Sequence, residues 1–152
     1  MTAPADPSHL PTVYVLNGPN LNLLGQREPE IYGRDTLADI EQAVRAHAAQ
    51  FGMAIVFRQT NHEGQLVDWL QEADQEGARA ILLNAAAYTH TSIALLDTIR
   101  AIATPVIEVH LSDPTKREAF RHHSYVGMAA THVVKGLGAR SYLVALEHVA
   151  QL

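Results

Sequence analysis

The sequence contains no cysteine among its 152 residues. This absence excludes a disulfide scaffold, a thiolate metal site, a cysteine nucleophile and a cysteine-held iron–sulfur cluster. Lysine is almost as scarce, since only Lys116 and Lys135 occur. Neither lysine lies in a motif at a predicted strand end, so we do not expect catalysis through a lysine imine.

Long apolar runs and an excess of positive charge are also missing. No stretch approaches the ~18 apolar residues of a membrane span, and the first residues lack the basic start and apolar core of a signal peptide. The 11 Lys and Arg against 16 Asp and Glu give a formal net charge of -5. This balance argues against a nucleic-acid-binding protein, which usually carries a basic face. We therefore expect a soluble cytoplasmic protein that binds neither nucleic acid nor a membrane.

The length fits one domain, and 47% hydrophobic residues are enough to form a core. Residues 1–11 are rich in proline and have no periodic pattern, so we predict a flexible N-terminal arm there. Residues 12–152 are predicted to form a single domain.

Short apolar runs alternate with amphipathic stretches along this domain. The runs predict strands at 12–16, 53–57, 80–83, 105–111 and 131–134. The amphipathic stretches predict helices at 36–51, 63–76, 92–102 and 141–152. This alternation is typical of an α/β fold with a five-stranded parallel sheet and helices on both faces. Ligands in such folds bind beyond the carboxyl ends of the strands, where the strand order reverses.

Polar side chains gather at those strand ends. Residues 17–20 follow the first strand and residues 84–92 follow the third. In the fourth strand Glu108 and His110 are two residues apart, which places them on one face. A carboxylate beside an imidazole orients a general acid or base. The alternative is a structural polar pair at the end of a strand.

The long polar stretch from residue 17 to 33 contains a second candidate pair, Arg27 and Tyr32. A guanidinium beside a phenol favours the phenolate and lowers the pKa of the tyrosine, which would make it a usable base. The alternative is a solvated loop whose tyrosine packs back on the fold.

A basic group follows the fourth strand and consists of Arg117, Arg121, His122 and His123. These side chains could bind an anionic or hydroxylated ligand. The alternative is that they form the solvent-exposed face of a helix.

Metal and nucleotide motifs give no support for a cofactor. The pair His122 and His123 belongs to no His-Glu-x-x-His helix, so we predict no metal site. Gly136 and Gly138 resemble part of a dinucleotide fingerprint, but Ser141 replaces its third glycine and no strand follows. The sequence has neither a Walker loop nor a Gly-x-Ser-x-Gly elbow.

Seven segments, taken together and in order, resemble the type II 3-dehydroquinate dehydratase family. They are LNGPNLNLLG at 16–25, REP at 27–29, YG at 32–33, NHEG at 61–64, YTHTS at 88–92, IEVH at 107–110 and FRHHSY at 120–125. The resemblance runs from about residue 13 to the end. It implies a flavodoxin-like fold, a single catalytic domain over 12–152, and a dodecamer built as a tetramer of trimers. It also implies removal of water from 3-dehydroquinate, giving 3-dehydroshikimate, with no cofactor and no metal.

The resemblance implies catalytic roles for the residues that match the family's motifs. Tyr32, as phenolate, takes a proton from the carbon beside the substrate ketone, and Arg27 stabilises that phenolate. The region of Asn20 holds a water that stabilises the resulting enolate. His110 protonates the leaving hydroxyl, and Glu108 fixes its ring.

The resemblance also implies substrate-binding roles. Asn84 and the backbone amides of Leu111 and Ser112 meet the substrate carboxylate, while His90 and Arg121 bind ring hydroxyls. In the family an aspartate at the position of Asp97 reaches the site of a neighbouring subunit, so a trimer completes the pocket.

Two departures from the family pattern concern affinity rather than the acid or the base. Asp113 and Pro114 stand where relatives usually carry Asn and then Val or Ile. A carboxylate at Asp113 weakens anion binding if it points inward, and Pro114 lacks a backbone donor. Residues 85–87 are all alanine, where relatives often carry glycine or proline.

An alternative function remains open at this stage. A non-catalytic flavodoxin-like module that binds a flavin or a small anion would use the same strand ends. That reading leaves the pairing of Arg27 with Tyr32 and of Glu108 with His110 unexplained.

Overall fold

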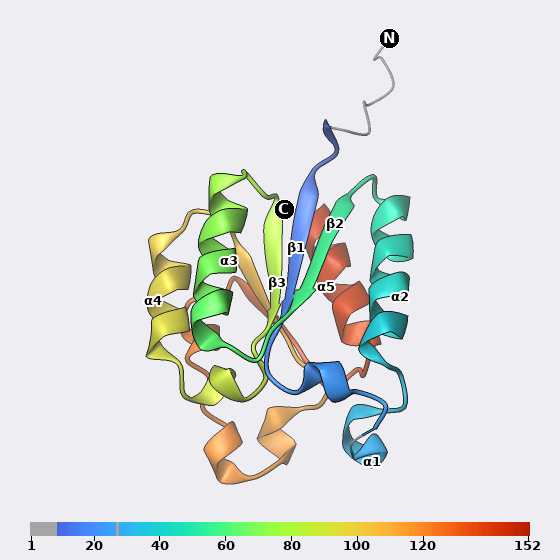
Figure 1. The fold of residues 1–152 in the computed structure, drawn as a ribbon, viewed down its shortest axis with the longest axis vertical. Helices are drawn as coiled ribbons and strands as arrows, with labels where there is room; N and C mark the ends of the chain where they lie inside the picture. The colour runs from blue at the N-terminus through green and yellow to red at the C-terminus, as the bar shows by residue number, and fades with distance from the viewer. Residues whose placement is uncertain (1–8, 27) are drawn as a thin grey trace.

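The computed structural model describes residues 9–26 and 28–152, with Pro29 and Tyr32 described by their backbone only. Its centre is a five-stranded sheet of parallel strands in the order β2-β1-β3-β4-β5 (Figure 1). This order confirms the predicted flavodoxin-like sheet and places the reversal of strand order between β1 and β3. The strands are β1 (Thr12–Asn17), β2 (Ala54–Gln59), β3 (Ala80–Asn84), β4 (Val106–Val109) and β5 (His132–Val134).

Helices cover both faces of the sheet, as predicted. Helices α2 (Leu37–Gln50) and α5 (Arg140–Ala150) lie on one face, and α3 (Glu63–Gln75) and α4 (Ile93–Ala101) lie on the other (Figure 1). The connections at the carboxyl ends of the strands hold the short elements. These are α1 (Pro29–Tyr32) and the 3-10 helices η2 (Leu21–Leu23), η3 (Ala86–His90), η4 (Pro114–Lys116), η5 (Ala119–Arg121) and η6 (Val126–Met128).

The alternation of side chains along β1 divides the core into two layers. Val13 and Val15 pack in the cluster that includes Val44 of α2, whereas Tyr14 and Leu16 pack in the cluster that includes Leu66 of α3. Successive residues of a strand point to opposite faces, so one strand supplies both layers. The central strands β1, β3 and β4 are thereby buried on both sides.

Side-chain caps set the starts of two helices. Thr36 and Asp39 form a capping box at α2, and the Ser92 hydroxyl accepts a hydrogen bond from the Leu95 amide at the start of α4. The helical periodicity of residues 36–51 places Phe51 on the inward face, but α2 ends at Gln50 and the Phe51 side chain is 43% exposed. The periodicity of residues 63–76 places Trp69 inward as well, and its side chain is half-buried.

The strands approach closely where their order reverses. The Gly18 amide donates to the Asn84 carbonyl at 2.8 Å, and a Cβ on Gly18 would lie 2.5 Å from the Ala85 carbonyl oxygen. Only glycine fits at this contact between the ends of β1 and β3. The next strand, β4, ends at Val109 and is shorter than the predicted 105–111, so His110 lies just beyond it.

The predicted N-terminal arm falls mainly on residues 1–8, which lie outside the described residues. Within the described part of the chain, no helix has the length and apolar character needed to cross a membrane.

Candidate active site

A cavity of about 180 Å³ lies beyond the carboxyl ends of β1, β3 and β4. The structure brings most of the predicted site residues together around it. Its lining includes Asn20, Asn84, His90, His110, Leu111, Ser112 and Arg121. The position agrees with the general rule for open α/β sheets, because these strands flank the reversal of strand order.

His110 and Glu108 form a tight buried pair at the wall of this cavity. Nε2 of His110 lies 2.5 Å from Oε2 of Glu108, and the two residues are 7% and 2% exposed. Burial raises the pKa of Glu108, but the hydrogen bond and positive charge of His110 lower it by more than burial raises it. The net pKa of Glu108 therefore lies below its usual value. An ionised Glu108 accepts the Nε2 proton and leaves Nδ1 of His110 for a ligand.

His90 presents a second imidazole to the cavity from the end of η3. Its Nδ1 lies 2.8 Å from the His123 carbonyl oxygen. Burial is the main reason that the pKa of His90 lies below its usual value, so the neutral ring is favoured. Since a carbonyl can only accept, Nδ1 carries the proton and Nε2 is left to accept from a ligand hydroxyl.

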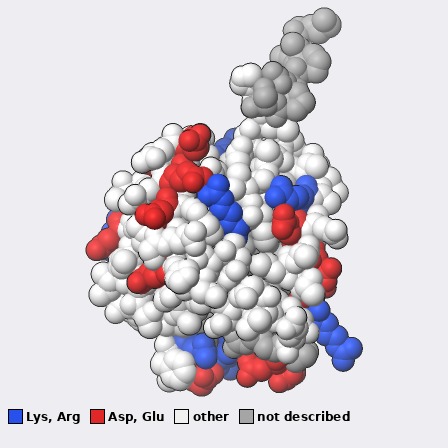
Figure 2. Space-filling view, in the orientation of Figure 1, with Lys and Arg blue, Asp and Glu red and all other residues white. Residues whose placement is uncertain are grey.

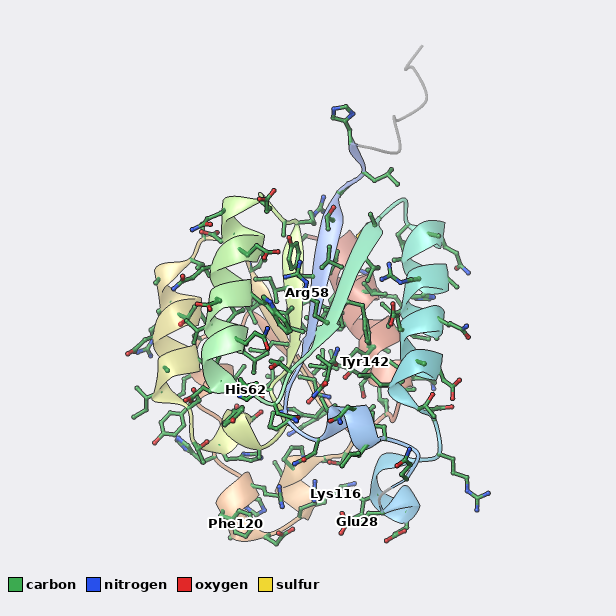
Figure 3. The ribbon with its side chains drawn as sticks, in the orientation of Figure 1. Glu28, Arg58, His62, Lys116, Phe120 and Tyr142 are labelled. Atoms are coloured by element: carbon green, nitrogen blue, oxygen red, sulfur yellow. The ribbon has the colours of Figure 1, made fainter. Side chains whose placement is uncertain are left out.

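Asn84 is held by a buried polar network that the sequence did not reveal. Its Nδ2 donates to the Tyr142 hydroxyl at 2.9 Å, and that hydroxyl donates to Oδ1 of Asn17 at 2.6 Å. Tyr142 comes from α5 and is fully buried between these strand ends (Figure 3). Burial raises the pKa of Tyr142, so its phenol stays protonated and able to donate.

The loop that carries Asn20 is held by residues at the end of β2 and just after it. Asn20 has a left-handed backbone with φ 69°, which asparagine tolerates better than most residues. Its amide donates to Oδ1 of Asn61 at 3.1 Å, and Gln59 donates to the same oxygen at 3.1 Å. The Tyr88 hydroxyl donates to the Asn61 carbonyl at 2.8 Å. The NHEG segment therefore supports the site by fixing a neighbouring loop.

Two arginines reach the cavity from the segment after β4. Arg121 donates from Nε to both carboxylate oxygens of Glu118 at 3.2 Å, and its guanidinium lies 5.0 Å from the Phe120 ring centre. Arg117 also lines the cavity, and its Nη1 lies 3.4 Å from the Ser112 hydroxyl. The sequence singled out both arginines as a basic group but assigned a binding role only to Arg121.

The surface around this end of the molecule carries charges of both signs. Figure 2 shows basic and acidic side chains side by side at the lower end, where Figure 3 labels Lys116, Phe120 and Glu28. The basic group is thus placed among acidic neighbours such as Glu118, which suits a small anion more than an extended polyanion.

The two departures from the family pattern are accommodated locally. Oδ1 of Asp113 accepts from the amide and the hydroxyl of Thr115 at 3.0 and 2.7 Å, and it lies 3.6 Å from Nζ of Lys135. The carboxylate is thus engaged by its own loop and by Lys135. Pro114 is the first residue of η4, a position where a missing N–H costs little.

Three of the predicted site residues are not tested by this cavity. Asp97, predicted to reach the site of a neighbouring subunit, lies exposed on α4, and Arg27 lies outside the described residues. Tyr32 ends α1, which is found at the same end of the molecule as the strand ends (Figure 1), but only its backbone is described. The predicted pairing of Arg27 with Tyr32 stays a prediction.

The donor set of the site bears on metal binding. Within residues 9–26 and 28–152, no three His, Cys, Asp or Glu side chains are grouped so as to hold a metal ion.

Comparisons with known proteins agree on one family. A family model described as "Dehydroquinase class II" matches residues 11–150. A 3-dehydroquinate dehydratase of Acidovorax ebreus is 56% identical over 144 residues, covering 92% of this chain and 97% of the relative. One from Hyphomonas neptunium is 61% identical over 140 residues, covering 92% of this chain and 93% of the relative.

Solved structures give the same result. The type II dehydroquinase from Propionibacterium acnes superimposes with a TM-score of 0.89 at 38% identity, covering 93% of this chain and 97% of that one. The type II dehydroquinase from Butyrivibrio crossotus superimposes with a TM-score of 0.90 at 34% identity, covering 92% and 97%.

Proposed function

This chain belongs to the class II dehydroquinase family, and we propose that it removes water from 3-dehydroquinate to give 3-dehydroshikimate. The observation that carries the proposal is the buried pair of His110 and Glu108, 2.5 Å apart at the wall of the strand-end cavity. An elimination needs an acid for its leaving hydroxyl, and an imidazole held by a carboxylate is suited to that task.

The first step removes a proton from the carbon beside the ketone. Tyr32, as phenolate, takes this proton, and the electron pair of the broken C–H bond forms an enolate. A free phenol with a pKa near 10 is under ~1% ionised at pH 7, so Arg27 is needed to favour the phenolate. A water held by the region of Asn20 donates to the enolate oxygen, which is electrostatic stabilisation by a preorganised donor.

The second step expels the hydroxyl group. The enolate electron pair forms the new C=C bond as the C–O bond breaks, and His110 donates its proton so that water leaves. Glu108 holds the ring in place through Nε2. The proton gained by Tyr32 and the proton lost by His110 balance, so the cycle consumes no cofactor.

Substrate binding uses the remaining residues of the cavity. Asn84 and the backbone amides of Leu111 and Ser112 hold the substrate carboxylate, and His90 and Arg121 bind the ring hydroxyls. The single protonated nitrogen of His90, at Nδ1, supports the role of Nε2 as a hydroxyl acceptor.

We also propose that the chain acts as a dodecamer, a tetramer of trimers. Asp97 is exposed on α4, and Ile93 of the same helix is 55% exposed, which supports burial of this helix face against a neighbouring subunit. In that arrangement Asp97 completes the site of the neighbour. The cytoplasmic location expected from the sequence stays a prediction.

A spectrophotometric assay for the conjugated enone product tests the proposed activity. Purified protein incubated with 3-dehydroquinate should form the enone at the same rate with and without a chelator, and the protein should be colourless. No enone formation with folded protein, or activity that a chelator abolishes and a divalent ion restores, would contradict the proposal. A yellow preparation would favour a flavin-binding module instead.

A further inference from the structure

The Glu108 carboxylate has a second partner besides His110. The hydroxyl of Ser124 lies 2.7 Å from Oε2 of Glu108, the same oxygen that lies 2.5 Å from Nε2 of His110. Ser124 precedes η6, in the FRHHSY segment. None of the catalytic roles described above uses this serine.

The direction of the Ser124 hydrogen bond is fixed by the backbone. The Gly127 amide lies 2.8 Å from the Ser124 oxygen and donates to it. An oxygen that accepts this N–H has its own proton left to donate, and Glu108 is the acceptor within reach. The Ser124 hydroxyl is therefore a donor to Glu108.

Gly127 is required for this close arrangement. A Cβ at this position would lie 2.8 Å from Oε1 of Glu108 and 3.1 Å from the Ser124 oxygen. The bare backbone of η6 thus packs directly against both side chains. Any side chain at position 127 has to displace Glu108, Ser124 or η6 itself.

The segment that carries Ser124 is also tied to the loop that carries His90. The Tyr125 amide donates to the Thr89 carbonyl at 2.9 Å, and Nδ1 of His90 donates to the His123 carbonyl at 2.8 Å. Ser124 lies between the two tied residues, so its position relative to β4 is set by η3 as well as by η6.

We propose that Ser124 is a positioning residue, whose hydroxyl, oriented by the Gly127 amide, holds the Glu108 carboxylate where it contacts His110. This inference rests on the proposed function, in which His110 is the acid. Two donors meet on one oxygen of Glu108, so the carboxylate cannot rotate without losing both hydrogen bonds.

The hydrogen bond from Ser124 also affects the ionisation of Glu108. Burial raises the pKa of Glu108, and the hydrogen bonds and charge of its partners lower it to a net value below the usual one. The groups that face Glu108 are His110, His90 and Ser124, and Arg121 in turn faces His90. Removal of the Ser124 donor raises the pKa of Glu108, because burial remains while one stabilising bond is lost.

The test is the pH profile of kcat for Ser124→Ala. If the reaction needs ionised Glu108, the acidic limb of the profile moves to higher pH by about one unit. At neutral pH we expect kcat to fall on the order of tenfold, a part of the ~10²–10⁴-fold that a general acid contributes. KM should stay within a few-fold, because the Ser124 hydroxyl contacts Glu108 and the Gly127 amide, neither of which is assigned to substrate binding.

Thr104→Val is a matched control. The Thr104 hydroxyl also donates to a carboxylate, Oδ1 of Asp74, at 2.8 Å. Thr104 lies before the first residue of β4, however, and so at the amino end of that strand, away from the cavity. This variant should lose thermal stability and keep the parent's pH profile. If Ser124→Ala gives no folded protein, Ser124→Cys replaces it, because a thiol fills similar space and is only a weak donor. Its acidic limb should also lie above that of the parent.

His110→Ala, measured in parallel, separates the two levels of the proposal. If His110→Ala keeps its kcat, the assignment of the acid fails. If His110→Ala loses kcat while Ser124→Ala keeps both the parent's kcat and its acidic limb, the assignment of the acid stands and the role of Ser124 is wrong.

Discussion

The hydroxyl of Tyr142 lies 2.9 Å from Nδ2 of Asn84, and this contact links the last helix to the strand-end cavity. The same hydroxyl donates to Asn17 at 2.6 Å, while Oδ1 of Asn84 accepts from the Ala86 amide at 3.3 Å. The amide of Asn84 is therefore held at both its nitrogen and its oxygen. Such a side chain presents its remaining N–H in one direction, as carboxylate binding requires.

Tyr142→Phe should therefore weaken both the fold and substrate binding. Removal of the hydroxyl leaves the buried amides of Asn17 and Asn84 each short of one partner, which costs about 1–3 kcal/mol per unsatisfied group. We expect a lower midpoint of urea unfolding and a higher KM, with a smaller change in kcat. Tyr14→Phe is the matched control, since it removes a partly buried tyrosine hydroxyl that donates to Glu72 at 3.1 Å on the α3 face. A parent-like KM for Tyr142→Phe would show that Asn84 needs no such support.

Ala86→Gly should stabilise the protein. Ala86 has φ 53°, a left-handed conformation that costs an alanine roughly 1–2 kcal/mol and costs glycine nothing sterically. After allowance for the greater freedom of glycine in the unfolded chain, we expect a gain of up to about 1 kcal/mol. Ala87→Gly, one residue further in η3, lacks this strain relief and should lose stability. The measurement is the midpoint of thermal unfolding of the two variants and the parent. An equal fall of the midpoint in both variants would contradict the proposal that the backbone of Ala86 is strained.

Glu108 should make the stability of the protein depend on pH in the acidic range. Its folded pKa lies below its usual value because the contact with His110 outweighs the effect of burial. A carboxyl with a depressed folded pKa contributes its full stability above the unfolded pKa of about 4.3, and that contribution is lost as pH falls through the folded pKa. The difference in free energy of unfolding between parent and Glu108→Gln should thus shrink as the pH falls below about 4.3. A difference that grows as the pH falls would contradict this sign.

The fold was predictable because its signals are local. The capping residues Thr36 and Ser92 mark the starts of α2 and α4, and the apolar runs mark the strands. The polar residues at the strand ends also pointed to the cavity, since parallel strands bring their carboxyl ends to one edge. Glu108 and His110 were recognisable as a pair by their spacing of two, although His110 lies just past the strand.

The supporting residues were not predictable from such signals. Tyr142 reads as one more apolar position of an amphipathic helix, and nothing local shows that its hydroxyl meets residues 17 and 84. The contact between Ser124 and Glu108 depends on the backbone path of η6, and that between Asn61 and Asn20 joins residues 41 positions apart. These contacts arise only when distant segments pack together.

Tyr32→Phe tests the proposed base, because it keeps the ring and removes only the hydroxyl. We expect kcat to collapse while substrate affinity persists. Arg27→Ala should act on the same step, and the double variant should be little worse than either single one, because the two residues act as a unit. Arg27→Lys should restore only part of the activity, since a point charge does not reproduce the planar guanidinium. Additive losses in the double variant would contradict a functional pair.

The most direct test of the account is kcat for His110→Ala, measured together with the dissociation constant for 3-dehydroquinate. A general acid acts in the transition state, so its removal should lower kcat by about 10²–10⁴-fold and leave substrate binding within a few-fold of the parent. Thermal unfolding of the same sample confirms that the variant is folded. A kcat within a few-fold of the parent in folded protein would contradict the role of His110 and direct the search for the acid to His90.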